Sequence, residues 1–406
     1  MERLKLFLSV VFQILKVHKR RTLLSMLGVL FGIFSLVAVG HISNAMTKKI
    51  KDTLNKFGPN LIIVRAGKVH VTGRGMKQFT TTQTLKMSDA KAIKTSIKGI
   101  KEVVPISEIT YPLRYKEKSM QVKIIGATPN IAHIRNLTLQ DGFFYGDEEE
   151  KRGLKKAVLG YKVWQTLFGE KRAFGKTILI WRVPCEVIGV LVPKGADLSG
   201  EDLDSVVYLP LRTVMRRFLN VDYLSGLLIQ AEEGTDLVIL KAEIRKLLRR
   251  RHGLTPMIKD DFSIYSLEDI AKTKQEGLML VSLLSKMAAI ISFAIGGLGI
   301  FAVMLLTVTE RQKEIGIRRA VGARKKDILW QFLGEACIIS FLGGIAGVTL
   351  GILVAIVVSL VAALPVIFNL SQLGLSLLIS LGLGTMAGAY PAYLAASLLP
   401  LKALRE

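Results

Sequence analysis

Between Ala336 and Leu401 the chain reads ACIISFLGGIAGVTLGILVAIVVSLVAALPVIFNLSQLGLSLLISLGLGTMAGAYPAYLAASLLPL, a stretch without one charged residue. A helix that crosses a membrane needs about 20 mainly apolar residues, so this stretch is long enough for two. The pair Leu364-Pro365 and the polar residues after it divide the stretch. It therefore predicts two membrane spans, near residues 335–363 and 373–396.

Two shorter uncharged runs lie upstream, at Thr22–Thr47 and Met287–Thr309. Each can hold one span, near residues 22–43 and 284–309. The prediction is a membrane α-helical protein with four transmembrane helices in a lipid bilayer. We expect no buried acidic or basic residue in the spans, which leaves a hydrophilic substrate no polar path through them.

The composition supports this class of protein. Of 406 residues, 50% are hydrophobic and 22% are charged, and the mean hydropathy is +0.41. These values exclude a disordered chain and are too apolar for one soluble globule of this size. The net charge is +24, and two cysteines exclude a disulfide-dense scaffold.

The short basic flanks predict the orientation. Residues 1–21 carry six basic residues against one acidic residue, and residues 310–327 carry seven against three. Such flanks stay in the cytoplasm, whereas long segments cross largely regardless of charge. We therefore expect a multi-pass membrane protein with both termini cytoplasmic and residues 44–280 outside.

The N-terminus allows two interpretations. Apolar residues recur at helical spacing before the first span, which predicts a cytoplasmic amphipathic helix at residues 1–21. The alternative is a cleaved signal peptide, with Arg20-Arg21 as its basic region and Ser43-Asn44-Ala45 as its cleavage site. The apolar stretch is longer than a usual signal core, so we expect it to be retained as a span.

The segment outside the membrane is predicted to be an α+β domain at residues 58–265. Helical patterns continue past the first span to Phe57 and precede the second, where Ser266 and Asp269 have the spacing of a helix N-cap. These patterns predict stalk helices that belong to residues 22–57 and 266–309. Valine- and isoleucine-rich strand candidates are Leu61–Val64, Gln121–Ala127, Thr177–Trp181, Cys185–Val192, Val206–Leu209 and Leu227–Ala231. Helix candidates are Ser88–Ser96, Tyr161–Leu167, Leu211–Asn220 and Asp236–Arg251.

No stretch of the sequence has the residue spacing of the enzyme motifs considered. Gly169–Thr177 imitates a phosphate-binding loop but has five residues between its glycines instead of four, and it leads into a strand candidate. The five histidines form no HExxH motif and no close pair, so we expect no metal site. The basic run Lys241–Arg251 lies on the outer side, where a solvated or lipid-facing surface is favoured over nucleic acid. We expect neither a catalytic residue nor a nucleic-acid partner.

Glycines recur at four-residue spacing in three of the spans. Such spacing lets helix backbones approach closely where lipid provides no hydrophobic drive. We expect packing seams within the subunit or in a dimer. The predicted seam residues are Gly28, Gly32, Gly343, Gly347, Gly351, Gly384 and Gly388.

The segment between the second and third spans mixes charges of both signs with Ile315, Ile317 and Val321. A segment that served only topology would not need apolar side chains among its charges. Mixed charge with apolar anchors is typical of a surface that docks a soluble protein.

Several stretches carry a resemblance to a known family. Thr309–Ala323 reads TERQKEIGIRRAVGA, and Gln331–Ala336 reads QFLGEA. Upstream, Gly58–Val64 reads GPNLIIV and Val187–Leu191 reads VIGVL. In these motifs, and in their order along nearly the whole chain, the sequence resembles MacB/FtsX-type ABC transporter permeases.

The resemblance implies a dimer with a second permease copy or paralogue, and an ABC ATPase docked at residues 310–334. Residues 335–406 would hold the last two spans and the C-terminus. MacB carries its ATPase at its N-terminus, whereas only about 20 residues precede the first span here. We therefore expect a separate ATPase subunit that binds ATP and Mg, with no cofactor on this chain. By analogy, the ATPase-coupling residues are Glu310, Arg311, Glu314, Gly316, Arg318, Arg319, Gly322 and Ala323.

The function that follows is that of a permease subunit in a mechanotransmission transporter. ATP-driven closure of the ATPase would move the coupling segment, and the stalk helices would carry that motion outward for export. A periplasmic adaptor (membrane fusion protein) is a further expected partner. The alternatives are an FtsX-like relay that activates an extracytoplasmic cell-wall hydrolase, and a permease that extracts lipoproteins from the membrane.

Overall fold

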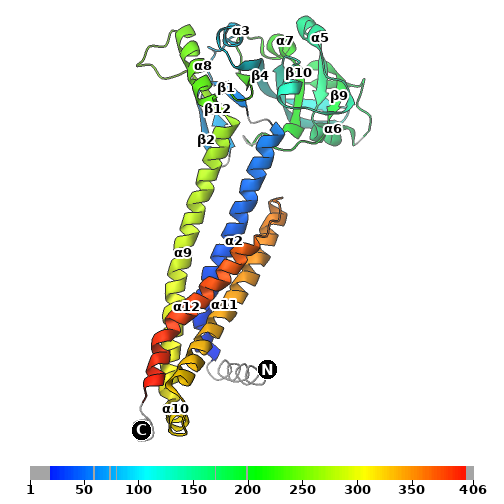
Figure 1. The fold of residues 1–406 in the computed structure, drawn as a ribbon. Coiled ribbons are helices and arrows are strands. Elements are labelled where there is room, and N and C mark those ends of the chain that lie inside the picture. Colours follow the sequence, from blue (N-terminus) through cyan, green and yellow to red (C-terminus); the bar gives the residue numbers. More distant parts are fainter. Residues whose placement is uncertain are drawn as a thin grey trace. The chain divides into compact units, whose positions relative to one another are not determined.

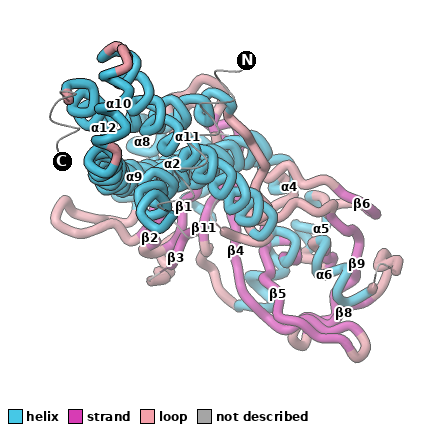
Figure 2. Tube along the Cα trace, turned by 90° about the horizontal axis from the view of Figure 1, so that it is seen from below, coloured by secondary structure: helices cyan, strands magenta, loops and turns pink. Residues whose placement is uncertain are grey.

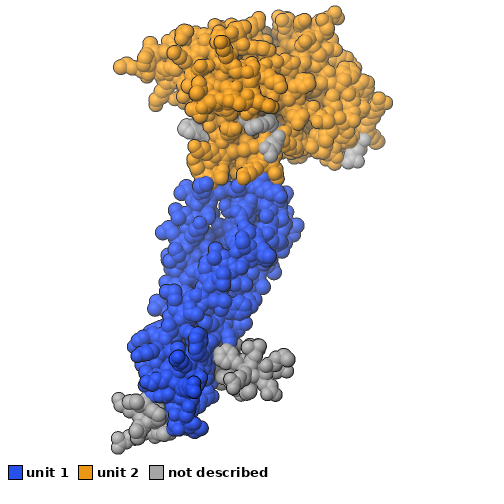
Figure 3. Space-filling model, viewed as in Figure 1, with its two compact units in different colours: residues 1–49, 277–406 blue, residues 50–276 orange. Residues whose placement is uncertain are grey.

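The computed structural model describes residues 19–57, 60–72, 75–78, 80–169, 171–197 and 200–398. Most of the amphipathic helix expected at residues 1–21 lies outside these ranges, as do Gly58-Pro59 and the last eight residues. The chain forms two compact units (Figure 3). Unit 1 comprises residues 1–49 and 277–406, and unit 2 comprises residues 50–276.

Unit 1 is built from long helices (Figure 1). They are α2 (Lys19–Phe57), α9 (Leu267–Glu310), α11 (Lys325–Val361) and α12 (Leu370–Ser397). In the described part of the chain, these four helices are long and apolar enough to cross a membrane. Each contains one predicted span, so the prediction of four transmembrane helices is confirmed. Helices α2 and α9 also extend into the residues of unit 2.

The N-terminus of α9 has the predicted cap. The Ser266 amide donates to Asp269 Oδ2 at 2.8 Å, and the Asp269 amide donates to Ser266 Oγ at 3.2 Å. Two amides that lack a helical partner are thereby satisfied, as in a capping box.

Close backbone contacts join the helices of unit 1. A Cβ added at Gly28 on α2 would lie 2.4 Å from Gly296 Cα on α9, and one at Gly347 on α11 would lie 2.6 Å from the Leu30 carbonyl oxygen on α2. Added Cβ atoms would lie within 3.0 Å of other atoms at four of the other five predicted seam residues, and at 3.2 Å from the Met26 carbonyl oxygen at Gly343. Their nearest neighbours are Phe293 for Gly32, Met26 and Val29 for Gly343, Val37 for Gly351, Ser340 for Gly384 and Ala336 for Gly388.

Unit 2 contains a mixed ten-stranded sheet (Figure 2). The strand order is β12-β1-β11-β4-β5-β10-β7-β9-β6, with β8 against β4 and β9. The strands are β1 (Leu61–Ala66), β4 (Ile100–Tyr115), β5 (Lys118–Ala127), β6 (Leu139–Gly142), β7 (Lys156–Leu159), β8 (Thr177–Ile180), β9 (Val183–Leu191), β10 (Val206–Pro210), β11 (Gly226–Ala231) and β12 (Phe262–Ser266). A separate hairpin joins β2 (Val69–Thr72) and β3 (Gly75–Gln78).

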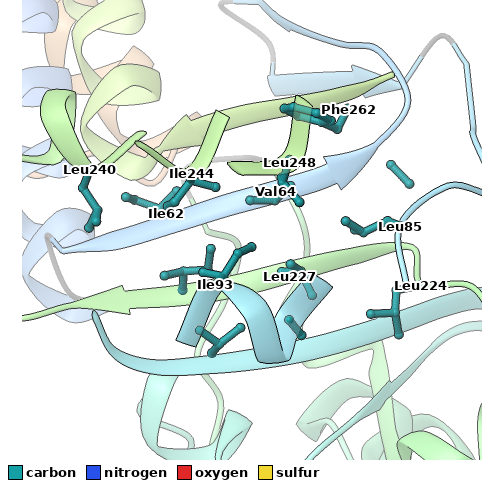
Figure 4. Close-up of a cluster of buried hydrophobic side chains, with 14 of the residues drawn as sticks. Ile62, Val64, Leu85, Ile93, Leu224, Leu227, Leu240, Ile244, Leu248 and Phe262 are labelled. Carbon is teal, nitrogen blue, oxygen red and sulfur yellow. The ribbon is translucent and has the colours of Figure 1, made fainter. Parts of the chain in front are cut away.

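Helices and two hydrophobic clusters complete unit 2. The helices are α3 (Met87–Ser96), α4 (Ile131–Ile134), α5 (Asp147–Arg152), α6 (Tyr161–Phe168), a 3-10 helix at Leu203–Ser205, α7 (Leu211–Thr213) continued by a π-helix at Val214–Leu219, and α8 (Leu237–Arg251). In one cluster, Ile244 and Leu248 of α8 pack with Ile62 and Val64 of β1 (Figure 4). The other cluster includes Val163 of α6 and neighbouring strands.

All six predicted strands and all four predicted helices are present. The helix predicted at Leu211–Asn220 begins as a short α-helix and continues as a π-helix to Leu219. Strand β4 was not predicted from the sequence. Its prolines and charged residues, such as Pro105 and Glu108, break the alternating pattern by which a strand is recognised.

The basic run on α8 is largely paired inside unit 2. Lys241 binds Asp269 at 2.6 Å, and Arg251 binds Asp89 at 2.6 Å. Arg245 and Arg249 both pair with Asp260. These charges therefore hold α8 against its neighbours.

The glycine contacts predict the effect of added volume. Gly28→Val should lower the thermal unfolding midpoint of the purified full chain by several degrees, because overpacking costs about 1–3 kcal/mol. Gly382→Val is the matched control, since a Cβ there meets no atom within 4 Å. Equal midpoints for the two variants would contradict a tight crossing of α2 and α9.

Candidate functional site

The segment between α9 and α11, residues 310–324, is a short helix with defined ends. After Glu310 ends α9, helix α10 runs over Gln312–Ala320. A turn follows in which Gly322 has φ +105°, a conformation that favours glycine. The Arg324 amide donates to Asp327 Oδ2 at 3.0 Å and caps α11. We call residues 310–324 the connecting segment.

One face of α10 is anchored in the apolar core of unit 1. Ile315 is 3% exposed, and Gly316 is buried beside it. Ile315 belongs to the same hydrophobic cluster as Val308 of α9 and Ile328 and Phe332 of α11. The anchored face fixes α10 against the ends of two membrane-spanning helices.

Glu335 corrects the expectation that the spans hold no buried charge. Its side chain lies on α11 and is 3% exposed. Arg311 Nη1 lies 3.5 Å from Glu335 Oε1, and Gln331 Nε2 donates to the same oxygen at 3.4 Å. The carboxylate is tolerated because it sits at the start of the uncharged stretch, within reach of the basic connecting segment.

These contacts close into a ring of five side chains, here called the polar ring. Gln331 Oε1 accepts from Arg318 Nη1 at 2.8 Å, so Gln331 bridges Arg318 to Glu335. Arg318 also binds Glu314, which lies 3.5 Å from Arg311. The polar ring ties both turns of α10 to α11 and leaves its five members with no net charge.

The turn after α10 is held by hydrogen bonds to backbone carbonyls. Arg319 Nη1 donates to the Ala323 carbonyl at 3.1 Å, and the Ala323 amide donates to the Arg318 carbonyl at 3.0 Å. Arg319 and Ala323 therefore shape the turn that leads into α11.

The opposite face of the connecting segment is exposed and mixed in character. Ile317 is 54% exposed and Val321 is 85% exposed. Exposed basic residues surround them on α10 and at the start of α11. These are Lys313, Arg324, Lys325 and Lys326. Apolar side chains within a basic rim can bind a protein surface of acidic character.

The structure divides the eight predicted coupling residues by role. Arg311, Glu314 and Arg318 belong to the polar ring, Gly316 is buried, and Arg319, Gly322 and Ala323 shape the turn. Glu310 is exposed at the end of α9. Sequence reasoning missed the roles of Gln331 and Glu335, although their four-residue spacing on a helix was a signal for contact.

Two further predictions from the sequence concern metal and phosphate binding. Among the residues that the structure describes, no group of three or more His, Cys, Asp or Glu side chains could hold a metal ion. The phosphate-loop imitation at Gly169–Thr177 leads into strand β8, as expected, and not into a helix.

Comparisons with known proteins match both parts of the chain. A family model described as MacB-like periplasmic core domain matches residues 22–247, and one described as FtsX-like permease C-terminal matches residues 286–400. The macrolide export ATP-binding/permease protein MacB of Bdellovibrio bacteriovorus is 34% identical, over 97% of this chain and 60% of that protein. The probable syringafactin export ATP-binding/permease protein SyfD of Pseudomonas syringae pv. syringae is 31% identical, over 95% and 58%.

Among solved structures, the periplasmic region of MacB from Actinobacillus actinomycetemcomitans is 21% identical, with a TM-score of 0.46. That match covers 55% of this chain and 97% of the other. The chain spans about three fifths of the length of the curated relatives it matches.

The polar ring predicts a measurable change in the protection of α10. Arg311→Gln should speed hydrogen exchange of amides in Gln312–Ala320 about tenfold, because the buried Glu335 carboxylate loses its charged partner. Lys313→Gln removes the same charge from an exposed position and should leave exchange unchanged. Mass spectrometry of the full chain compares the two. Equal exchange would show that the ring does not hold α10.

Proposed function

Because this chain belongs to the family of permeases that combine a MacB-like periplasmic core domain with an FtsX-like permease domain, we propose that it is the permease component of an ATP-driven exporter. Its relatives are named as ATP-binding/permease proteins for export. The energy would come from an ATP-binding component that docks on the connecting segment. That component, and not the residues described here, would bind ATP and Mg.

The main support for this proposal is that the connecting segment is anchored on one face and exposed on the other. A helix that transmits force must be held firmly on one side and present a binding surface on the other. The polar ring and Ile315 supply the first, and exposed Ile317 and Val321 supply the second. A mobile loop would absorb the displacement of a bound partner instead of passing it on.

The proposed orientation of the chain in the membrane rests on the distribution of basic residues. The connecting segment and residues 1–21 are both strongly basic, and short basic flanks remain on the cytoplasmic side. Unit 2 is then extracytoplasmic, and an even number of spans returns the C-terminus to the cytoplasm of a bacterial cell with this protein in its inner membrane.

The helix lengths support mechanical coupling. Helix α2 has 39 residues and α9 has 44, and both are continuous from the apolar spans into residues of unit 2. A displacement of the connecting segment at the end of α9 would therefore travel along an unbroken helix. In the described spans, the buried acidic or basic residue is Glu335, which lies at the end next to the connecting segment. The spans therefore offer a hydrophilic compound no polar path, and the proposed cargo is a lipophilic compound or one handled on the outer side. A second permease copy or paralogue and a periplasmic adaptor complete the proposed assembly.

The exposed apolar residues provide the direct test. Val321→Asp in the full chain, purified with its ATP-binding component, should lower permease-stimulated ATP hydrolysis about tenfold, because a buried unpaired carboxylate opposes docking. Val238→Asp on α8 is the control, since Val238 is 72% exposed and apolar but lies in unit 2. Undiminished stimulation with normal membrane insertion would remove the connecting segment from its proposed role.

A charge reversal tests the ring and the docking surface together. Glu314→Lys should abolish stimulated ATP hydrolysis while membrane insertion is kept, because it opposes both Arg311 and Arg318. In reconstituted vesicles, ATP hydrolysis and the amount of inserted permease are measured on the same sample, so that a loss of activity can be told from a loss of insertion. Full activity in this variant would contradict the coupling role of α10.

A further inference from the structure

We propose that a cleft in unit 2 binds an uncharged, polyhydroxylated ligand, which is a small saccharide or the terminal unit of a longer glycan. The cleft has a volume of about 310 Å³ and lies beside the middle of β4. This inference goes beyond the exporter function and concerns a part of the chain that the connecting segment does not include.

The sheet itself creates the cleft. The pairing of β11 with β4 reaches Ile106, and the pairing of β8 with β4 begins at Leu113. In the described sheet, the residues of β4 between these points pair with β5 alone. The Glu108 amide donates instead to Ser225 Oγ at 3.0 Å. One edge of β4 is thus left open over a short length, and the cleft occupies the gap.

Hydroxyl groups dominate the polar lining. Each can both donate and accept a hydrogen bond, as the hydroxyl groups of a sugar do. The hydroxyl-bearing lining residues are Thr81, Thr82, Thr110, Tyr223 and Ser225. Ile109, Leu224 and the Tyr223 ring add apolar surface, which suits the C–H face of a sugar ring.

Glu108 at the wall of the cleft has an unsatisfied acceptor. Its Oε2 lies 2.7 Å from both Arg65 and Lys123, whereas its Oε1 is buried and has no partner among the described residues. Burial acts to raise the pKa of Glu108, but Arg65 and Lys123 outweigh it and hold the pKa well below its ordinary value. The carboxylate is therefore ionised and can only accept, so the ligand must donate.

Local charge decides which kind of donor fits. Lys123 lies 2.6 Å from Glu201, which also binds Arg135 at 3.5 Å. The cluster thus holds three cations and two carboxylates, with Arg65 and Glu108 included. An ammonium ligand would add charge to a cluster that is already positive, and an anion in the cleft would lie beside the Glu108 carboxylate. A neutral hydroxyl satisfies the oxygen without either cost.

The size of the cleft limits the ligand. Small-molecule sites have volumes of about 300–1,000 Å³, and this cleft lies at the low end of that range. It therefore admits a small saccharide or one end of a longer chain, with the remainder outside.

The experiment titrates the full chain with maltose and with N-acetylglucosamine by ligand-observed NMR. The protein is held in lipid nanodiscs or a polyoxyethylene detergent, because alkyl maltosides carry a sugar themselves. Sulfate and tetramethylammonium serve as charged probes. We expect saturable binding of at least one sugar, and no competition from either ion. Absence of saturation by both sugars, or tighter binding of an ion, overturns the proposal.

Variants locate the binding. Thr110→Val and Thr81→Val together should weaken sugar affinity about tenfold, because two hydroxyl partners are lost and the fold is kept. Thr177→Val is the control, since Thr177 is an exposed strand threonine outside the cleft. Unchanged affinity in the double variant, or equal loss in the control, would place any sugar elsewhere. Glu108→Gln breaks a buried ion pair with Arg65, so the threonine variants keep the test independent of folding.

Because the readout needs no ATP-binding component, its result is separate from that of the docking experiment. A chain that binds sugar but fails to stimulate ATP hydrolysis would keep this inference and lose the exporter function. The reverse outcome would do the opposite.

Discussion

The lack of water around its helices is the constraint on which unit 1 depends. In lipid, polar groups must find partners within the protein, and helices associate through close packing instead of hydrophobic drive. Gly28 against Gly296, and Gly347 against the Leu30 carbonyl, bring backbones into contact where a side chain would not fit. The one buried acidic side chain of α11, Glu335, is placed where Arg311 and Gln331 can reach it. Tight crossings and a closed polar ring are two answers to the same constraint.

Unit 2 meets the opposite constraint, because its faces are exposed to water and its core must be enclosed. It does so with two hydrophobic clusters along one mixed sheet, and β4 contributes to both through Val103 and Leu113. A strand that serves two cores changes partners along its length, and Glu108 lies at the open edge between its partners. The polar cleft is thus a by-product of how the sheet joins its two halves.

Features decided by local composition could be predicted from the sequence, and features decided by long-range contacts could not. The four spans follow from runs without charge, and the Ser266–Asp269 cap follows from a three-residue spacing. Strand β4 was missed because its prolines and charged residues break the alternating pattern, and because Glu108 is paired by Arg65 from a distant part of the chain. The eight residues of the connecting segment were assigned a coupling role by resemblance alone, whereas their division into ring members and turn residues needed the structure. Glu335 lies one residue before the uncharged stretch, so composition gave no sign that it is buried.

The neutrality of the polar ring has a kinetic consequence. Since the ring cancels its own charges, the field outside α10 comes from the remaining charged residues of 310–327, among which five basic residues outnumber Glu310 and Asp327. An excess of one sign accelerates the encounter with an oppositely charged surface and loses that advantage within about 8 Å at physiological ionic strength. For the proposed ATP-binding partner, the rate of arrival would therefore depend on salt, whereas the lifetime of the complex would depend on the apolar contacts of Ile317 and Val321.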